Sequence, residues 1–245
     1  MELDLYTRAG ELPEGRTKGR HVVVIDVLRA SSTIVHACEN GVERIIPVAS
    51  VEDATKLKPT LEKKNALLGG ERDGISIDGF DLGNSPLEYV SKVVKGKTLV
   101  LSTSNGTVAI TQSAAAKEIL VGCFLNLSAV VSHLLSSRPK KVTLLCAGNQ
   151  GQLSLEDLVC GGLMVAKITK TFRGKLVLND GAVAGRELAH TMSDIGEVVR
   201  NSIHGRRLSG LGFDADLEFC SRIDKYGSVP VVVEGRIAGS EASRR

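Results

Sequence analysis

Hydrophobic residues in this chain gather in short continuous runs, most of which do not alternate with polar residues. The runs lie at residues 22–26, 44–48, 66–70, 98–102, 118–122, 142–146, 176–180 and 229–233. Continuous apolar runs of this length are typical of strands that are buried on both faces of a sheet. Helical stretches separate the runs. The pattern therefore predicts an α/β fold, with three α/β/α layers around a largely buried, mixed or mostly parallel sheet.

Helix starts are marked by capping-box spacing at residues 50–53, 85–88 and 154–157. In such a box a serine side chain and an acidic residue three positions later satisfy the free N–H groups of the first turn. No low-complexity linker interrupts the chain. We therefore expect one α/β domain over residues 1–245, with two tightly packed subdomains as the alternative. Residues 234–245 are polar and are expected to fray.

Composition excludes several classes of function. Of 245 residues, 42% are hydrophobic, enough for an ordinary core, but only 3% are aromatic and Trp is absent. Platforms that stack single-stranded bases are therefore not expected. The net charge is +3, with scattered basic residues apart from a pair at Arg206 and Arg207, so no nucleic-acid partner is expected either.

The cysteines and the absence of targeting signals point to one cellular location. There are five cysteines, an odd number, without a C-x-x-C pair, which predicts reduced core residues. No apolar segment approaches the ~18 residues of a membrane helix, and the N-terminus lacks an apolar signal core. We therefore expect a cytoplasmic protein without a membrane partner. A homo-oligomer is compatible with the sequence.

Four of the predicted strands share a feature that suggests a ligand site. Each of the runs 22–26, 98–102, 142–146 and 176–180 is followed by a small polar or Gly-containing loop and then by a helix. In open α/β sheets, ligands bind outside the carboxyl ends of the strands. If the four strands are parallel, their loops share one edge. That edge would then offer Asp26, Arg29, Ser102, Thr103, Asn105, Thr107, Asn149, Glu156, Asp157 and Asp180. Carboxylates, hydroxyls and helix N-termini together suit Mg²⁺ and an anion.

The segment at the end of the first of these strands has the most side chains that could bind a ligand or take part in catalysis. Asp26 ends the strand, Arg29 follows, and the hydroxyls of Ser31, Ser32 and Thr33 come where a helix would begin. Asp26 could hold a metal or cap the turn, and the hydroxyls could bind an anion or cap the helix. Arg29 favours a functional site, because capping a turn needs no cation.

A long Gly-rich segment, residues 69–86, is a second candidate, since loops of this length in compact domains are usually functional or disordered. At its start, Glu71 is a candidate metal ligand and Arg72 a candidate anion contact. Asn84 lies near its end. We interpret Asp73 and Asp78 as members of surface ion pairs.

Three further motifs leave two interpretations each. The segment Ser102 to Thr107, with Asn105, could cradle a phosphate without a Lys, or it could be an ordinary Asn-Gly turn. Asp157 could act in catalysis or complete a capping box, and Glu156 could merely favour the helix dipole. His204 could supply a proton or clamp an anion, although a lone His is more often a surface residue. Asp216 is interpreted as a helix-surface charge.

Missing motifs narrow the chemistry. The chain has no second Asp two positions after Asp26, and neither G-x-S-x-G nor H-E-x-x-H. Metal-assisted hydrolysis with acidic ligands is the simplest remaining enzyme mechanism.

The motifs taken together resemble the 2-phosphosulfolactate phosphatase family. They are DVLRASST, GERDG with GFDLGNSP, STSNGT, the G-x-x-G-x-x-S-x-E-D run and the terminal S-x-H-G stretch, and the resemblance spans about residues 21–233. One departure is Ser31, where the family pattern has Thr. The resemblance implies Mg²⁺-dependent hydrolysis of 2-phospho-3-sulfolactate to 3-sulfolactate and phosphate. In methanogens this is a step towards coenzyme M, but relatives occur in bacteria that do not make that cofactor.

Motif position and chemistry suggest roles for individual residues in that reaction. Asp26 and Glu71 would be the Mg²⁺ carboxylates, with Asp157 or Asp180 as a third ligand or as the base. Arg29 would stabilise charge on the phosphoryl group during attack by an activated water, or Asp26 would itself be the nucleophile. Expected substrate contacts are Ser31, Thr33, Arg72, Asn84, Ser102, Asn105, Thr107 and His204. A phosphatase of another small phosphorylated hydroxy acid and a non-catalytic binder of an anionic metabolite stay as alternatives.

Overall fold

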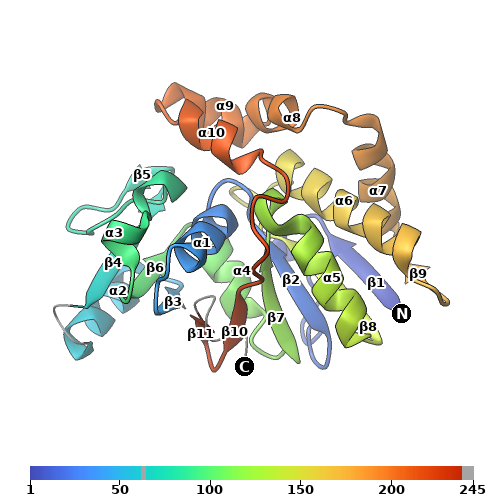
Figure 1. The fold of residues 1–245 in the computed structure, drawn as a ribbon, viewed down its shortest axis with the longest axis horizontal. Coiled ribbons are helices and arrows are strands. Elements are labelled where there is room, and N and C mark those ends of the chain that lie inside the picture. Colours follow the sequence, from blue (N-terminus) through green and yellow to red (C-terminus); the bar gives the residue numbers. More distant parts are fainter. Residues whose placement is uncertain (62–64, 239–245) are drawn as a thin grey trace.

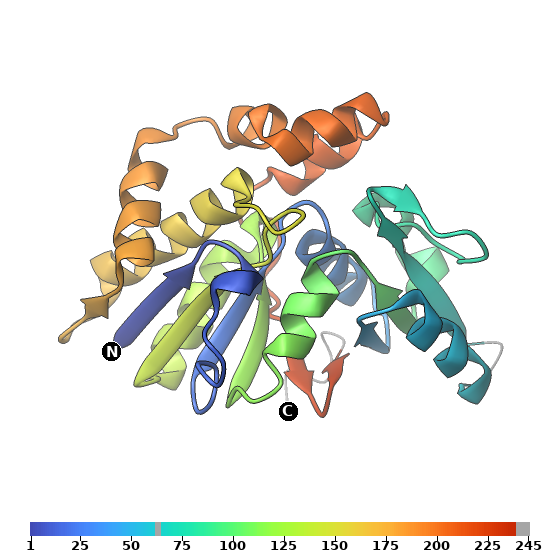
Figure 2. The same cartoon turned by 180° about the vertical axis from the view of Figure 1, so that it is seen from behind.

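The computed structural model describes residues 1–61 and 65–238 and confirms the α/β prediction (Figures 1 and 2). An 11-stranded, mostly parallel sheet runs through this part of the chain. Its strands are β1 (Glu2–Tyr6), β2 (His21–Ile25), β3 (Arg44–Val48), β4 (Ala66–Arg72), β5 (Ile75–Ser76), β6 (Thr98–Ser102), β7 (Glu118–Gly122), β8 (Lys141–Cys146), β9 (Val177–Leu178), β10 (Val231–Val233) and β11 (Arg236–Ala238). The α-helices are α1 (Ala30–Glu39), α2 (Val51–Leu57), α3 (Ser91–Val94), α4 (Gly106–Gln112), α5 (Leu127–Ser137), α6 (Leu155–Thr171), α7 (Asp180–Thr191), α8 (Ile195–Asn201), α9 (Ile203–Gly210) and α10 (Asp214–Cys220).

The strand order divides the sheet into two parallel parts. The order is β5-β4-β6-β3-β11-β10-β7-β2-β8-β1-β9. Strands β4, β6 and β3 pair in parallel, and so do β7, β2, β8, β1 and β9. The hairpin β10–β11 lies between the two parts and pairs antiparallel with β7 and β3. The C-terminal hairpin therefore joins the two parallel parts into one sheet.

That hairpin corrects the expectation of a frayed tail from residue 234 onwards. Residues 236–238 form a strand, and Ile237 is fully buried against β3. The segment looked polar because a three-residue strand needs only one inward side chain to anchor it. The rest of the expected tail, 239–245, lies outside the described residues.

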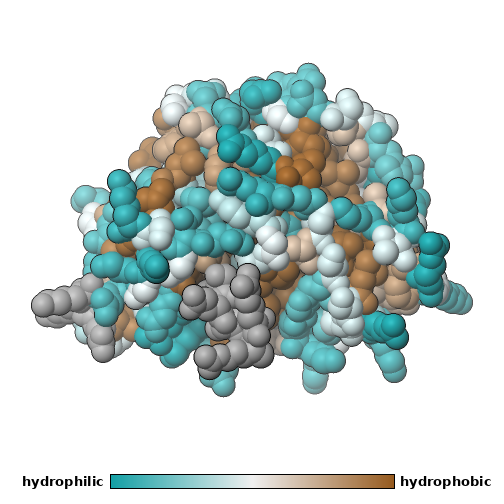
Figure 3. Space-filling model, in the orientation of Figure 1, coloured by the Kyte–Doolittle hydropathy of each residue, from teal (hydrophilic) through white to brown (hydrophobic). Residues whose placement is uncertain are grey.

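Helices cover both faces of the sheet. Helices α1, α3, α5 and α6 lie on the face seen in Figure 1, and α2 and α4 on the face seen in Figure 2. Helices α8 to α10 form a cap across the top of Figure 1, above the sheet. Strand β2 is buried along its whole length, as its continuous apolar sequence predicted. In the space-filling view, hydrophilic residues cover most of one face and hydrophobic ones lie in separate patches (Figure 3).

Capping-box spacing correctly predicted where two of the helices begin. Ser50 caps α2 by accepting the N–H of Asp53, as the capping box predicted. At Ser154 the prediction was only half right. This residue is the N-cap of α6, but its side chain makes no capping hydrogen bond. The side chain of Asp157 instead accepts the N–H of Val27 in the β2–α1 loop.

All five cysteines are unpaired and buried, as expected of core residues. Among the residues that the structure describes, no helix combines the length and the apolar character needed to cross a membrane.

Candidate active site

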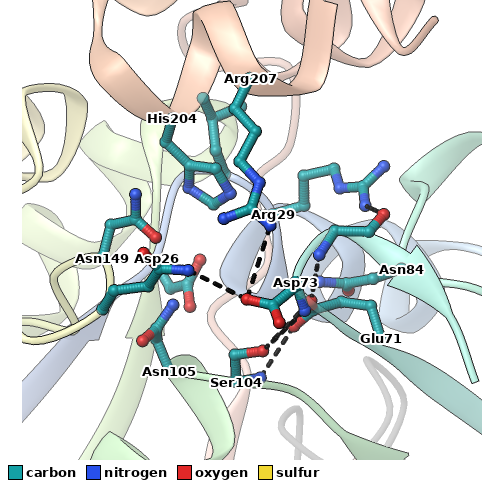
Figure 4. Close-up of a pocket in the computed structure, with 13 residues that line it drawn as sticks. Asp26, Arg29, Glu71, Asp73, Asn84, Ser104, Asn105, Asn149, His204 and Arg207 are labelled. Atoms are coloured by element: carbon teal, nitrogen blue, oxygen red, sulfur yellow. Dashed lines mark hydrogen bonds and ion pairs between the residues drawn. The ribbon is translucent and has the colours of Figure 1, made fainter. Parts of the chain in front are cut away.

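A pocket lies between the carboxyl ends of the sheet strands and the helical cap (Figure 4). Six segments contribute to it: the β2–α1 loop, the end of β4 with the β4–β5 turn, the segment between β5 and α3, the β6–α4 loop, the β8–α6 loop and α9. Its lining residues are Asp26, Leu28, Arg29, Glu71, Asp73, Gly74, Asn84, Ser104, Asn105, Asn149, Gln150, His204 and Arg207. The loops after β2, β6 and β8 therefore meet, as the strand-end argument predicted.

Asp26 is the carboxylate that follows β2 directly. Its Oδ1 accepts the N–H of Ala30 at 3.1 Å, and its own N–H donates to Oγ of Ser31 at 3.0 Å. The start of α4 also approaches closely, because a Cβ added at Gly106 would lie 2.6 Å from Oδ2. Burial raises the pKa of Asp26 from 3.8 to about 7. Ionised Asp26 is therefore a buried charge that favours a cationic neighbour.

Arg29 is held rigidly on the same loop. Its Nη1 donates to Oδ2 of Asp216 at 2.7 Å, and its Nη2 donates to the carbonyl of Gly74 at 3.0 Å. The ring of Phe213 lies 4.2 Å from the guanidinium carbon. The peptide bond between Leu28 and Arg29 is cis. Since a guanidinium has five N–H donors, these contacts leave others for an anion in the pocket.

Two further carboxyl groups are buried at the start of α6. Asp157 accepts the N–H of Val27 at 2.8 Å and that of Gly148 at 3.3 Å. Neither oxygen of Glu156 has a hydrogen-bond partner among the described residues, and Nδ1 of His204 lies 3.8 Å from its Oε1. Burial raises the pKa of both carboxyl groups. Glu156 is therefore a buried carboxyl group whose charge, when it is ionised, no hydrogen bond from the described residues stabilises.

Glu71 organises the opposite wall. Its Oε1 accepts the N–H of Ser104 at 2.8 Å, and its Oε2 accepts the N–H of Gly74 at 2.7 Å. The carboxylate thus fixes the β6–α4 loop against the β4–β5 turn. A metal at Glu71 would have to share oxygens that already accept backbone N–H groups.

Helix α9 supplies the basic side of the pocket. It begins at the N-cap Ser202, and the spacing of His204 and Arg207 places both on the pocket side (Figure 4). Burial lowers the pKa of His204 from 6.5 to about 4, so its imidazole is neutral at pH 7. Nη2 of Arg207 lies 3.5 Å from Oδ1 of Asp73, which also accepts the amide N–H of Gln150 at 2.9 Å.

Two predicted substrate contacts on α1 have structural roles instead. Ser31 accepts the N–H of Asp26, and Thr33 donates to the carbonyl of Asn84 at 2.8 Å. Both hydroxyls are buried and outside the pocket lining. Asn84, also predicted, does line the pocket, and its buried Oδ1 has no partner among the described residues.

The β6–α4 loop shows the same division. Thr107 exchanges hydrogen bonds with Thr103, and Ser102 accepts from Nη2 of Arg72 at 2.8 Å. None of these side chains lines the pocket, whereas Asn105 does. Arg72 ties β4 to β6, so its predicted anion contact is not supported by its position.

Asp180 is not at the pocket, and its prediction as a metal ligand is corrected here. It is exposed at the start of α7, after the short strand β9. Strand β9 is the edge of the sheet and is separated from β2 by β1 and β8. The loop after β9 therefore lies too far along the sheet to reach Asp26.

Comparison with known proteins decides the family. A family model described as 2-phosphosulpholactate phosphatase matches residues 6–235. A probable 2-phosphosulfolactate phosphatase of Clostridium acetobutylicum is 40% identical, covering 97% of this chain and 100% of that protein. One of Thermotoga petrophila is 43% identical over 88% of this chain and 90% of its own length. The chain belongs to the 2-phosphosulfolactate phosphatase family. The resemblance inferred from the motifs, and with it the phosphoric monoester hydrolase class, is confirmed.

Several residues in or beside the pocket of this family member were not predicted as site residues from the sequence. Asp73, interpreted as a member of a surface ion pair, does pair with Arg207, but it does so at the pocket mouth. Asp216, interpreted as a helix-surface charge, is the buried partner of Arg29. Ser104 and Gln150 lie inside motifs that were singled out for other residues. The Asp73-Gly74 pair is a tight-turn signal that could have placed Asp73 at the tip of a hairpin. No local signal marks Asp216, which is 187 positions from Arg29.

Two buried carboxylates of this phosphatase-family member fit a hard divalent cation: Asp26 in the pocket lining, and Glu156 beside His204 but outside that lining. Asp26 and Glu156 are buried carboxylates, and the nearby imidazole of His204 is neutral, so their charge is not balanced locally. Within the described residues, no group of three or more His, Cys, Asp or Glu side chains forms a ready metal cluster. Mg²⁺ tolerates this, because it keeps several waters and binds through one or two carboxylates plus substrate oxygens.

Proposed function

We propose that the protein hydrolyses the phosphate monoester of 2-phospho-3-sulfolactate, with Mg²⁺, to give 3-sulfolactate and phosphate. The observation that carries this proposal is the convergence of Asp26 and Arg29 on one pocket beside α9. Relatives named probable 2-phosphosulfolactate phosphatase, which match nearly the whole chain, support the substrate. The substrate bears phosphate, carboxylate and sulfonate, and Arg29 and Arg207 offer guanidinium groups to such anions.

Arg29 and Asp26 perform complementary tasks in this mechanism. Arg29, fixed by Asp216 and Gly74, directs its remaining N–H donors at the phosphoryl oxygens and stabilises the charge that develops there. Asp26 faces the same group and positions the attacking water, or attacks phosphorus itself. His204 is neutral at pH 7, so its ring N–H can donate a hydrogen bond to an oxygen of the anionic substrate without adding charge to the ground state.

Asp157 acts through the loop and not on the substrate. Both of its oxygens accept backbone N–H groups, from Val27 and from Gly148. It thereby joins the β2–α1 loop to the β8–α6 loop. We assign it as a positioning residue in place of the catalytic role predicted from the sequence.

Asp26 and Glu156 would hold the metal, with Glu71 as a further predicted ligand. When bound, Mg²⁺ supplies a Lewis acid that polarises the phosphoryl group. The orphaned oxygens of Glu156 favour this residue over Asp180, which is exposed at the sheet edge.

The test is phosphate release from 2-phospho-3-sulfolactate by purified protein, with Mg²⁺ and with EDTA. We expect release only with Mg²⁺. Asp26→Asn should abolish it, whereas Asp78→Asn, the same change at an exposed acid outside the pocket lining, should not. Release from other phosphorylated hydroxy acids but not from this one would indicate a different substrate. Saturable binding without release would indicate a binder.

The cytoplasmic location, the homo-oligomer and any link to coenzyme M stay predictions. A location outside the cytoplasm would be detected by fractionation, and the oligomeric state by light scattering.

A further inference from the structure

Three segments far apart in the sequence are joined at the pocket mouth through one side chain. Asp73 accepts the amide N–H of Gln150, from the β8–α6 loop, at 2.9 Å. The same oxygen, Oδ1, lies 3.5 Å from Nη2 of Arg207 on α9. Figure 4 shows Arg207 and His204 descending from α9 towards the pocket, with Asp73 below Arg207.

The turn that presents Asp73 is well defined. Arg72 pairs with Ile75, so Asp73 and Gly74 form a two-residue hairpin turn with φ values of 56° and 84°. Positive φ at both positions is the type I′ turn, which Asp-Gly and Asn-Gly favour equally. Asp73 is therefore held at the hairpin tip, and its side chain can be changed to an amide without changing the turn.

The pocket in this state is small. Its cavity volume for water-sized molecules is about 20 Å³, and a single water needs on the order of 10–15 Å³ by the same measure. A phosphate ester with two further acidic groups is many times larger. A substrate of this size therefore extends beyond the cavity, past the contacts that Asp73 makes at the mouth.

The contact between Asp73 and Arg207 is one that another anion can readily replace. Its side chain is 64% exposed and that of Arg207 is 40% exposed, so water screens their attraction and the pair opens easily. Arg29, by contrast, is buried and paired with Asp216, itself buried. The pocket thus contains one fixed guanidinium beside Asp26 and one loosely held guanidinium at the mouth.

Resting on the proposed function, we infer that Arg207 binds the second anionic group of the substrate, its sulfonate or carboxylate, and that Asp73 occupies this position in the free protein. The entering anion displaces the Asp73 carboxylate from Arg207, and the mouth opens in the same step. A guanidinium can bind a sulfonate or carboxylate through two parallel hydrogen bonds, which the single long contact to Asp73 does not use. Substrates without a second anion gain nothing from this exchange.

The experiment compares two substrates and three variants. The substrates are 2-phospho-3-sulfolactate and phenyl phosphate, which has no second anion. Arg207→Gln should raise KM for the first by about 10-fold or more and leave that for the second within about 3-fold, because only one charge-assisted contact is lost. Asp73→Asn keeps the turn and should lower KM for the first substrate only. Arg206→Gln, the matched control, changes a neighbour that bonds to the carbonyl of Asn201 outside the pocket lining, and should behave as wild type.

A double variant gives the decisive comparison. If Asp73 acts by competing for Arg207, Asp73→Asn should lower KM in the wild type but not in the Arg207→Gln background. A rise in KM for Asp73→Asn, or equal effects of Arg207→Gln on both substrates, would overturn the inference.

Failure of the proposed function gives a different result. If the wild type releases no phosphate from 2-phospho-3-sulfolactate, the proposed function fails. Calorimetric binding of 3-sulfolactate, which has both acidic groups and no phosphate, then tests Arg207 independently. Binding that is weakened by Arg207→Gln and strengthened by Asp73→Asn supports the inference, and binding indifferent to both contradicts it.

Discussion

Arg29 and Asp216 form a buried ion pair that ties the candidate active site to the helical cap. Nη1 of Arg29 lies 2.7 Å from Oδ2 of Asp216, and both side chains are almost entirely excluded from solvent. Ser85 completes the arrangement by donating to the other oxygen of Asp216 at 2.6 Å. The orientation of the guanidinium is thus set by α10 and by the segment before α3, and only indirectly by the loop that bears it.

Asp216→Asn should therefore impair both stability and turnover. Breaking a buried ion pair leaves an uncompensated charge and costs about 3–5 kcal/mol in the free energy of unfolding. We expect kcat to fall by about 10-fold or more, since a misdirected guanidinium stabilises the transition state less. Ser85→Ala, which removes one neutral donor to the same carboxylate, should cost only about 1 kcal/mol. Urea unfolding with steady-state kinetics measures both, and a wild-type kcat in folded Asp216→Asn would contradict the assignment.

Gly106→Ala should disable Asp26 through a steric contact. The added Cβ would lie 2.6 Å from Oδ2 of Asp26 and 2.6 Å from Cβ of Ala30, so one of them must shift. Alanine is otherwise favourable at a helical position, so a loss would come from this contact and not from helix propensity. We expect kcat to fall by about 10-fold or more, on the order of what a misplaced catalytic group costs. Gly227→Ala has open space around the new Cβ and is the matched control. Unchanged kinetics in both would show that Asp26 tolerates displacement.

Strand positions and the first catalytic motif were predictable because their signals are local. The runs at 98–102 and 118–122 are strands with those same bounds, because a strand buried on both faces is largely apolar. The run at 44–48 is also a strand with its predicted bounds, but buried and half-buried residues alternate along it. Asp26 and Arg29 follow a strand and precede a helix, which places them at the carboxyl edge whatever the strand order.

The sequence could not predict features that depend on the order of the strands in the sheet or on ion pairs between residues far apart in the chain. Asp180 follows the same strand–loop–helix pattern as Asp26, but β9 is at the sheet edge, and no local feature reveals this. Strand β1 was missed because Asp4 interrupts its apolar residues. That aspartate is buried, paired with Arg20 at 2.8 Å, so it looks polar in the sequence and behaves as core.

Asp26→Asn should stabilise the protein while removing activity. Burial raises the pKa of Asp26 in the folded state to about 7, above its ordinary value of 3.8. Above pH 3.8 the unfolded chain loses this proton more readily than the folded one, so the carboxylate reduces stability increasingly up to about pH 7. The amide carries no such charge. In EDTA we expect the variant to be more stable by about 1–3 kcal/mol at pH 8 and equal near pH 4. Asp78→Asn should show no such pH dependence, and an Asp26→Asn protein no more stable than wild type at pH 8 would refute the argument.

The contact between His133 and Glu118 predicts a second, separate pH dependence. Nε2 of His133 lies 3.1 Å from both oxygens of Glu118, at the start of β7 and so at the opposite end of the strands from Asp26. The hydrogen bond to Glu118 raises the pKa of His133 above 6.5, and the same bond lowers that of Glu118 below 4.5. The histidine contribution is complete below pH 6.5 and is lost as the pH rises through its raised pKa. The glutamate contribution is present above pH 4.5 and is lost as the pH falls through its lowered pKa.

The pair should therefore stabilise the fold most between about pH 4.5 and pH 6.5. Both side chains are partly exposed, so the expected contribution is about 0.5–1 kcal/mol and should shrink in high salt. His133→Gln should lower the free energy of unfolding in that window and much less at pH 9, with kcat unchanged because the pair is remote from the pocket. His190→Gln, the same change at an exposed position, is the control. A His133→Gln deficit that is equally large at pH 9 would mean that packing, and not the charged hydrogen bond, is what His133 contributes.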